Sequence, residues 1–579
     1  MRNRGLIICL AAVAYGLTAY VIPKGGFWIN DNGCKYLQVV SLFRNGVWNA
    51  AIDWLGEKVD PEFRFAPLQP PFGYVIDGKL YAQYPPFFAA VSAVPFRWLG
   101  TAGLYLLPFA GGLATLAAVW RLAQLVSEKD LANAASSVLI RETDGSAIAS
   151  THRKPVTLAS TLAVFVVGLG TPLWFYSVTF WEHTPAVALI AWSVVLYLQS
   201  ARKRASRSPW PSAVLLGAAT YFRDDTYLLA GAWILVLAAS RESRRAVPVL
   251  VATLVAAWIP LWLYHAVAIG HPLGLHFRGA GPLDGGIGTY FAERWLVIRN
   301  LLLDSHGNSW VSLLCSTALW FSGAAIAVRG RNRSWNTIWI GIAVLAAIVV
   351  GAGHLTATQP MWYLMSSNSL LAAAPVLVPC ALRWGASPAA ARFVWKLSMV
   401  YTGIYCVVAP PLNTDGIHWG CRFLLPIYAL LGTMAGVGIA DHWSQSRFRL
   451  AFRLAAGMLV GVSVWMQVYS VSLLYRRQGA SAKLNEAIAR KKADAWITDG
   501  WFLPQEFAFD FPNRPVFLLT RPDDWPELRA RLVQAGMHDV LFVYALGDSD
   551  RPPESVEIVD DAMRFIRIGL ATEGLDGNP

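Results

Sequence analysis

The 579-residue sequence contains few charged residues for its length. Only 15% of its residues are Asp, Glu, Lys or Arg, whereas 55% are hydrophobic and the mean hydropathy is +0.42. Soluble domains carry about 25% charged residues, so this composition excludes a soluble protein and predicts a polytopic membrane protein. The net charge of +12 does not indicate nucleic-acid binding, because the Lys and Arg residues form short clusters between apolar runs, as topology signals do.

Cysteine is also scarce, and several common motifs are missing. The six cysteines form no CxxC pair and show no zinc-type spacing, so neither a metal cluster nor a disulfide scaffold is indicated. No nucleotide-binding glycine loop occurs in the last hundred residues, and no internal repeat is detectable. Cys34 and Cys421 both fall in predicted outer loops, where an oxidising compartment leaves a disulfide between them open.

The apolar runs predict a chain that crosses the membrane repeatedly. Arg2 and Arg4 place the N-terminus in the cytoplasm, and the run at 6–22 lacks a signal-peptide cleavage site, so we expect an uncleaved first span. Alternating basic clusters and apolar runs then predict about thirteen crossings. We expect the further spans within 87–126, 157–180, 184–199, 212–239, 247–269, 307–328, 335–355, 364–383, 391–411, 422–440 and 451–475.

The stretch 212–239 is predicted to be a pair of short helices rather than one span. Arg223-Asp224-Asp225 interrupts it, and each arm is shorter than the roughly 20 residues that a straight span needs. Broken helices are tolerated in a membrane protein where they line an enclosed cavity. We therefore expect this tip to lie near a site on the outer side.

Two regions are predicted to lie outside the membrane. The first outer loop, 24–85, contains an amphipathic pattern at 35–44 and a hairpin pattern at 73–84, with the Asp77-Gly78 turn and Lys79 near its tip. Residues 478–579 have ordinary soluble composition and alternate strand-like and helical patterns. We expect a transmembrane domain at 1–477 and a small extracytoplasmic α/β domain at 478–579.

The polar residues that this topology places outside combine acids, bases and arginines. Asp31 follows the first span, where a carboxylate is costly to keep and therefore indicates a functional site. Arginines at 223 and 422 suit the binding of a phosphate, while a carboxylate can deprotonate a hydroxyl or an amine. The three outer histidines lie in different loops, so no metal site is predicted, although a divalent cation as cofactor is left open; these histidines are His183, His271 and His418.

At these positions the sequence resembles the GT-C superfamily of membrane glycosyltransferases, which includes protein O-mannosyltransferases and the aminoarabinose transferase acting on lipid A. The resemblance covers roughly residues 1–475 and rests on the order of several short motifs, each weakly specific alone. These are Asn30-Asp31-Asn32, Tyr84-Pro85-Pro86, Tyr176-Ser177 with Glu182-His183, Arg223-Asp224, Ala268-Ile-Gly-His-Pro272, and His418-Trp-Gly-Cys-Arg-Phe-Leu-Leu-Pro426.

The resemblance implies transfer of a sugar from a polyprenyl phosphate carrier to a lipid, glycan or protein acceptor on the outer side of the inner (plasma) membrane. Asp31 would be the general base of an inverting displacement. The expected donor-phosphate residues are Lys79, Arg223 and Arg422, and the expected acceptor or second-acid residues are Tyr84, Glu182, His183 and Asp224.

The sequence departs from the family at two of these motifs. Asn32 stands where many relatives have a second acid, so a paired-carboxylate role is in doubt. Tyr84 stands where the aminoarabinose enzymes have the lysine of Lys-Pro-Pro, which leaves Lys79 as a substitute. A transporter or flippase for a lipid-linked saccharide is the alternative, but it would usually show repeated halves and charges near the bilayer midplane.

Overall fold

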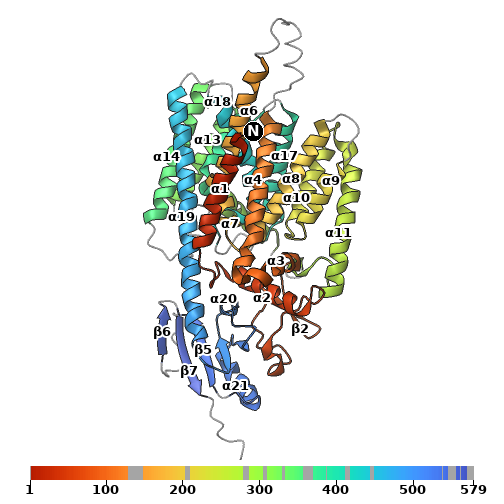
Figure 1. Ribbon diagram of the computed structural model, residues 1–579, viewed down its shortest axis with the longest axis vertical. Coiled ribbons are helices and arrows are strands. Elements are labelled where there is room, and N and C mark those ends of the chain that lie inside the picture. Colours follow the sequence, from red (N-terminus) through yellow and green to blue (C-terminus); the bar gives the residue numbers. More distant parts are fainter. Residues whose placement is uncertain are drawn as a thin grey trace, which may run out of the picture. The chain divides into compact units, whose positions relative to one another are not determined.

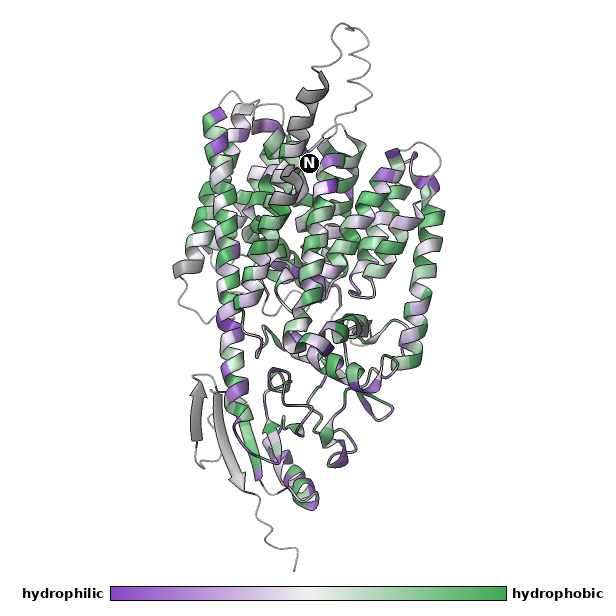
Figure 2. Ribbon diagram, in the orientation of Figure 1, coloured by the Kyte–Doolittle hydropathy of each residue, from purple (hydrophilic) through white to green (hydrophobic). Residues whose placement is uncertain are grey.

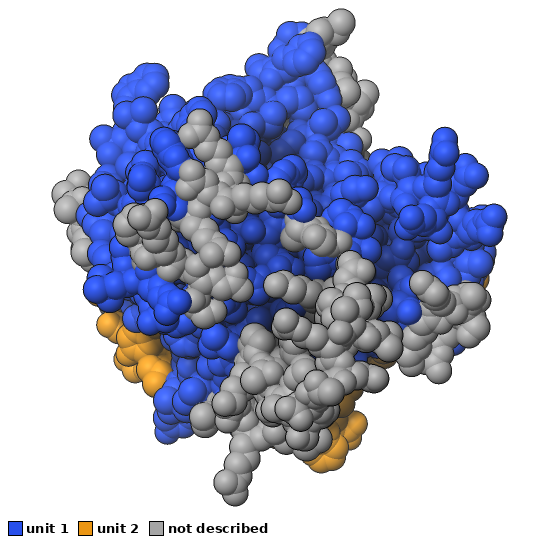
Figure 3. Space-filling view, turned by 90° about the horizontal axis from the view of Figure 1, so that it is seen from above, with its two compact units in different colours: residues 1–20, 107–259, 282–473 blue, residues 21–106, 260–281, 474–579 orange. Residues whose placement is uncertain are grey.

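The computed structural model is a mostly helical protein whose chain divides into two compact units (Figures 1 and 3). Unit 1 comprises residues 1–20, 107–259 and 282–473, and unit 2 comprises 21–106, 260–281 and 474–579. The structure describes residues 2–127, 148–202, 209–277, 286–303, 310–328, 333–356, 369–385, 388–410, 418–443, 449–537, 539–545, 556–560 and 563–569.

Unit 1 is built from apolar helices, which appear predominantly green in Figure 2. Seven described helices of the chain are long and apolar enough to cross a membrane, and four shorter apolar helices accompany them. The helices that lie wholly or mostly in unit 1 are α1 (Arg2–Val21), α4 (Leu106–Ser127), α6 (Ile148–Gly170), α7 (Leu173–Ser177), α8 (His183–Arg202), α9 (Trp210–Ala219), α10 (Thr226–Ala238), α11 (Val247–Ile269), α12 (Gly286–Ile298), α13 (Trp310–Val328), α14 (Arg333–Thr356), α16 (Leu370–Ala373), α17 (Ala389–Val408), α18 (Leu425–Trp443) and α19 (Arg449–Ala489).

Helix α18 is the most deeply buried of the candidate spans and packs against α6. Their backbones meet at Gly436, where an added Cβ would lie 2.4 Å from Cα of Ala163. Small residues permit this close approach, and helix association in membranes depends on such packing because lipid provides no hydrophobic drive. The interface therefore needs glycine at position 436.

The sequence predicted most of these helices, with two exceptions. The expected span at 364–383 is not one α-helix: its described part is the short α16 followed by a 3₁₀-helix, η6 (Pro375–Arg383). Pro375 and Pro379 lack the backbone N–H groups that α-helical bonds would use. Helix α12 and a π-helical turn, η5 (Arg299–Leu303), occupy a region that was expected to be an outer loop.

The end of α17 is bound by a buried side chain of α12. Nη1 of Arg294 donates to the carbonyl oxygens of Val407 at 2.9 Å and Ala409 at 2.6 Å, with a longer contact of 3.4 Å to Cys406. The last turn of a helix leaves carbonyl groups without intrahelical partners. Arg294 therefore acts as a C-terminal cap contributed by a neighbouring helix.

Unit 2 contains residues 24–85, the segment that was predicted to form the first outer loop. Its elements are α2 (Asn30–Asn45), η1 (Leu55–Lys58), β1 (Gly73–Ile76), β2 (Lys79–Ala82), α3 (Pro86–Leu99) and η2 (Gly100–Tyr105). The predicted hairpin is confirmed: β1 and β2 pair antiparallel, and Asp77 and Gly78 have φ values of 50° and 68°. Two consecutive left-handed residues are typical of a type I′ hairpin turn. The helix predicted at 35–44 begins earlier, at Asn30, and so includes Asp31.

The C-terminal part of unit 2 is the predicted α/β fold. The strands β3 (Ala495–Thr498), β4 (Val516–Leu518), β5 (Asp539–Ala545), β6 (Val556–Asp560) and β7 (Met563–Gly569) form a sheet in the order β4-β3-β5-β7-β6, accompanied by α20 (Leu503–Glu506), η9 (Pro522–Asp524) and α21 (Trp525–Gln534). Strand β3 is parallel to both of its neighbours, and β7 pairs antiparallel with β5 and β6.

The first outer loop packs on this sheet within unit 2. Nε1 of Trp54 donates to the carbonyl of Val516 at 2.8 Å, and the backbone N–H of Leu518 donates to Phe65 at 3.0 Å. The buried carboxylate of Asp60 accepts from Nη1 of Arg531 at 2.9 Å. These bonds cover the β4 edge of the sheet, which would otherwise expose unpaired backbone groups.

Candidate functional site

Asp31 lies in the first turn of α2, in unit 2, and its carboxylate is buried. A negative charge is favoured at this end of a helix by the helix dipole. The phenol of Tyr84 donates a hydrogen bond of 2.6 Å to Oδ1 of Asp31. Two residues predicted to belong to the site, 31 and 84, are thus in direct contact although 53 positions separate them.

Lys35 completes what we call the Asp31 cluster, which consists of Asp31, Lys35 and Tyr84. Its side chain is only 2% exposed, and Nζ lies 3.7 Å from the centroid of the Tyr84 ring. Such a contact between an ammonium group and an aromatic face is attractive, and more so where water is excluded. Lys35 was assigned no specific role from the sequence, because an amphipathic pattern does not tell which lysine of a helix turns inward.

The pKa of Tyr84 is well above its ordinary range, because burial disfavours the phenolate and the charge of Asp31 opposes it. Tyr84 is therefore a hydrogen-bond donor at all physiological pH values. It can orient a carboxylate, but it cannot take a proton from a substrate.

Asn32, which replaces the second acid of the resembled family, has a structural role. Its Oδ1 accepts a hydrogen bond of 3.3 Å from the backbone N–H of Ile29, at the start of α2. An aspartate carboxylate could accept the same bond, so the amide is not required by this contact. Lys79, by contrast, is exposed at the start of β2, beside the hairpin turn.

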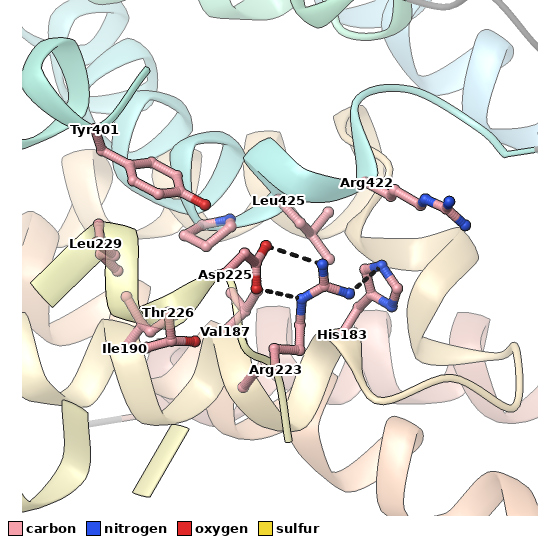
Figure 4. A pocket seen from close by; sticks show the side chains of 12 residues that line it. His183, Val187, Ile190, Arg223, Asp225, Thr226, Leu229, Tyr401, Arg422 and Leu425 are labelled. Carbon is pink, nitrogen blue, oxygen red and sulfur yellow. Dashed lines mark hydrogen bonds and ion pairs between the residues drawn. The ribbon is translucent and has the colours of Figure 1, made fainter. Parts of the chain in front are cut away.

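In unit 1, the tip between α9 and α10 carries an ion-paired arginine (Figure 4). Nε and Nη2 of Arg223 each donate to one oxygen of Asp225 at 2.9 Å, and Nη1 lies 3.3 Å from Oε1 of Glu182. Asp225 therefore forms a bidentate pair with Arg223, and the backbone carbonyl of Asp224 accepts from the N–H of Tyr227. Sequence reasoning placed both acids at the tip but did not single out Asp225.

His183 takes part in the same network, which we call the Arg223 site: Glu182, His183, Arg223 and Asp225. Nη1 of Arg223 lies 2.6 Å from Nε2 of His183. A guanidinium can only donate, so Nε2 must be the unprotonated nitrogen of a neutral imidazole. The proton is then on Nδ1, which lies 3.7 Å from Oε1 of Glu182. The ring of His183 stacks on Tyr176 with a centroid distance of 4.9 Å.

Arg422 lies close to the Arg223 site. Its guanidinium is 4.8 Å from the Phe423 ring centroid and 5.4 Å from that of Trp181, and the Arg223 guanidinium lies 5.1 Å from the same Phe423 ring. Both arginines line a pocket. Its charged or polar lining consists of His183, Arg223, Asp225, Thr226, Tyr401 and Arg422. The remaining lining is apolar and comes from Ala186, Val187, Ile190, Leu229, Leu425 and Pro426.

No family model matches the sequence, and no curated protein matches it. Solved structures do match the fold. ArnT from Cupriavidus metallidurans aligns over 98% of both chains, with 12% identity and a TM-score of 0.52 in the apo state and 0.51 when bound to undecaprenyl phosphate. The fold of this chain is similar to that of ArnT. The helical, multi-pass architecture predicted from the sequence is therefore confirmed, and the described residues hold seven candidate spans and four shorter apolar helices.

An oligosaccharyltransferase from Archaeoglobus fulgidus, in complex with Zn and sulfate, aligns over 93% of this chain and 67% of its own, with 10% identity and a TM-score of 0.45. That lower similarity adds nothing to the assignment of the ArnT fold. At these identities the comparisons establish the fold alone, and the activity must be argued from the residues.

The described residues contain no group of three or more His, Cys, Asp or Glu side chains arranged to hold a metal ion. In the Arg223 site the acids are bound to a guanidinium, which already supplies a positive charge. The six cysteines are free thiols. Cys34 and Cys421 are both buried, and Sγ of Cys421 donates to the carbonyl of Leu301 at 3.0 Å.

Proposed function

We propose that this protein is an inverting glycosyltransferase that moves a sugar from a polyprenyl phosphate carrier to an acceptor on the extracytoplasmic side of the inner membrane. The observation that carries the proposal is the buried carboxylate of Asp31, oriented by the Tyr84 phenol in a chain with the ArnT fold. The structure of ArnT bound to undecaprenyl phosphate supports a carrier of that class. The sugar and the acceptor are not specified by these features.

In the proposed reaction, Asp31 removes the proton of the acceptor hydroxyl or amine as that atom attacks the anomeric carbon. The bond between the anomeric carbon and the phosphate oxygen breaks, and its electron pair leaves with the polyprenyl phosphate. Attack from the face opposite the phosphate inverts the configuration. No covalent enzyme intermediate is formed.

We assign the developing phosphate charge to Arg223, Arg422 and Lys79. Planar guanidinium groups suit phosphate oxygens, and the pocket that the two arginines share has an apolar lining that suits the start of a lipid chain. Lys79 is exposed and would act as a point charge. For the acceptor or as second acids we assign Tyr84, Glu182, His183 and Asp224, with Glu182 and His183 also holding Arg223.

We further propose about thirteen membrane crossings, with a cytoplasmic N-terminus and residues 478–579 as an extracytoplasmic domain. The seven long apolar helices and the four shorter ones support a number above seven. The pair α9 and α10, with 10 and 13 residues, supports two short spans whose Arg223 tip is sunk below the outer surface.

The test uses purified protein in proteoliposomes with a panel of radiolabelled hexosyl and pentosyl undecaprenyl phosphates, and a cell-envelope extract as acceptor. We expect transfer of label to the extract, and a loss of at least about 100-fold in kcat for Asp31→Asn, the usual effect of removing a general base. Asp77→Asn is the matched control, since Asp77 is an exposed acid of the same loop and asparagine tolerates its positive φ.

A fully active Asp31→Asn variant would remove the base assignment. If no member of the panel is transferred but the vesicles take up or translocate the labelled lipid, the protein is a transporter or flippase instead.

A further inference from the structure

Tyr84 contacts α2 through three different parts of the residue. Its hydroxyl donates to Oδ1 of Asp31, its ring lies under Nζ of Lys35, and its backbone carbonyl accepts 2.8 Å from Nε2 of Gln38. Positions 31, 35 and 38 are spaced by four and three residues, so they share one face of the helix. One face of α2 therefore binds the whole of Tyr84.

We infer that Tyr84 is a positioning residue for Asp31 and that Lys35, whose ammonium lies over the Tyr84 ring, restrains that ring. This inference rests on the proposed function, because it describes how the base of that reaction is oriented. Tyr84 itself takes no proton in this scheme. It holds the carboxylate of Asp31 in one orientation.

The hydrogen bond restrains the carboxylate of Asp31. Oδ1 accepts a hydrogen bond of 2.6 Å from the phenol, which limits rotation of the carboxylate plane. A hydrogen bond to an ionised carboxylate stabilises the charged form, which keeps Asp31 deprotonated and able to act as a base at lower pH. Without that bond the carboxylate can rotate and protonates more readily.

Lys35 and His276 restrain the ring that carries the hydroxyl. The ammonium of Lys35 lies over the face of the Tyr84 ring, and the His276 ring meets it edge-on at a centroid distance of 5.6 Å. Rotation of the phenol away from Asp31 would break both contacts. Cys34, another titratable group on this part of α2, is a buried thiol whose pKa is raised by that burial and then by Asp31, so it stays neutral.

A merely structural role predicts different kinetics from a positioning role. If Tyr84 only fills space, Tyr84→Phe keeps the ring, the Lys35 contact and the Gln38 bond, and should have wild-type activity. If Tyr84 orients the base, the same variant loses one hydrogen bond at Asp31, and the effect falls on kcat while donor binding is unchanged.

The experiment measures kcat, the KM for the transferred donor of the panel above, and the pH–rate profile. For Tyr84→Phe we expect kcat to fall about 10- to 100-fold with KM within about 2-fold, and the acid limb to move to higher pH. For Lys35→Met we expect about a 10-fold fall in kcat, and the double variant should be no worse than Tyr84→Phe because both act on one group. Lys58→Met, at an exposed position of the same loop, should match the wild type.

The inference would be overturned if the wild type is active and Tyr84→Phe has the same kcat and the same acid limb of the pH–rate profile. A wild type that transfers no sugar would overturn the proposed function instead. If Tyr84→Phe does not fold, 3-fluorotyrosine at position 84 keeps the shape and strengthens the donor. The acid limb should then move to lower pH, and an unchanged limb would contradict the positioning role.

Discussion

The guanidinium of Arg223 and the carboxylate of Asp225 form a bidentate pair, with Nε and Nη2 each 2.9 Å from one carboxylate oxygen. The two side chains are 11% and 14% exposed. Bidentate pairs of this kind fix direction as well as distance. Asp225 therefore determines which N–H groups of Arg223 remain available to a ligand.

Asp225→Asn should weaken donor binding more than it slows transfer. The amide oxygen of asparagine can accept from only one of the two Arg223 donors, so the guanidinium loses its fixed direction. We therefore expect KM for the undecaprenyl phosphate sugar to rise about 10-fold, with a smaller change in kcat. Removing one partner of a buried pair should also lower the free energy of unfolding by about 3 kcal/mol. Steady-state kinetics, titration with undecaprenyl phosphate and thermal unfolding measure these effects.

The control for that variant is Glu242→Gln, which removes one exposed negative charge from unit 1. It should leave KM and stability unchanged. Equal donor affinity in Asp225→Asn and wild type would show that Arg223 is held without Asp225.

Gly33→Ala should displace α20 from α2. A Cβ at position 33 would lie 1.9 Å from the backbone oxygen of Gln505, so one of the two backbones must move. Overpacking of this kind costs about 1–3 kcal/mol, and here the obstacle is main chain and cannot rotate away. We expect a lower unfolding temperature and faster proteolysis of the segment around α20, followed by mass spectrometry.

Gly461→Ala is the matched control, since a Cβ at that helical position meets nothing within 4 Å. It should be neutral or slightly stabilising, because alanine favours helix. If Gly33→Ala were as stable as this control, the close approach of α2 and α20 would be wrong.

Lys24 should be the most readily acylated lysine of the outer loop near pH 8. Burial lowers its pKa to about 8, while its Nζ donates to the carbonyl of Ile22 and lies 4.2 Å from the Tyr105 ring centroid. About half of Lys24 is then neutral at pH 8, against about 1% or less of an ordinary lysine, and we expect labelling about 10-fold faster than at Lys58. Peptide mass spectrometry after a short pulse of acylating reagent gives the ratio.

The ratio should fall toward one as the pH rises to about 10, where ordinary lysines also lose their proton. The effect of pH on stability through Lys24 has the opposite sign to the effect through a salt-bridged lysine. The depressed pKa means that the contribution of Lys24 is fully present above its ordinary value of 10.5 and is lost as the pH falls to about 8. Equal labelling of Lys24 and Lys58 at pH 8 would contradict the lowered pKa.

Local patterns carried much of the fold prediction. The Asp77-Gly78 turn specified its hairpin, and the interruption at residues 223–225 specified two short helices, because turn residues and helix lengths act over a few positions. The C-terminal strands β3, β4 and β5 were predicted from short apolar runs. Strands β6 and β7 were not predicted, although their sequences, VEIVD and MRFIRIG, are mostly apolar with interspersed charges.

The candidate site was harder to predict because its contacts join distant positions. Nothing near residue 31 indicates that its partner is Tyr84, and nothing near residue 223 indicates that His183 supplies an acceptor nitrogen. Lys79 was predicted from a turn, whereas Lys35 is the buried lysine beside Asp31. Which side chains of a short helix point inward depends on how the helix is rotated about its axis, and tertiary packing determines that rotation.

The Arg294 cap has a consequence for how α17 can sit in a bilayer. A helix end normally needs water for its last carbonyl groups, and hydrocarbon provides no donors. Nη1 of Arg294 contacts the carbonyls of Cys406, Val407 and Ala409, so this end is independent of hydration. The depth at which α17 stops is therefore not limited to the level of the lipid headgroups, and thinning or thickening of the surrounding lipid should leave the helix end intact.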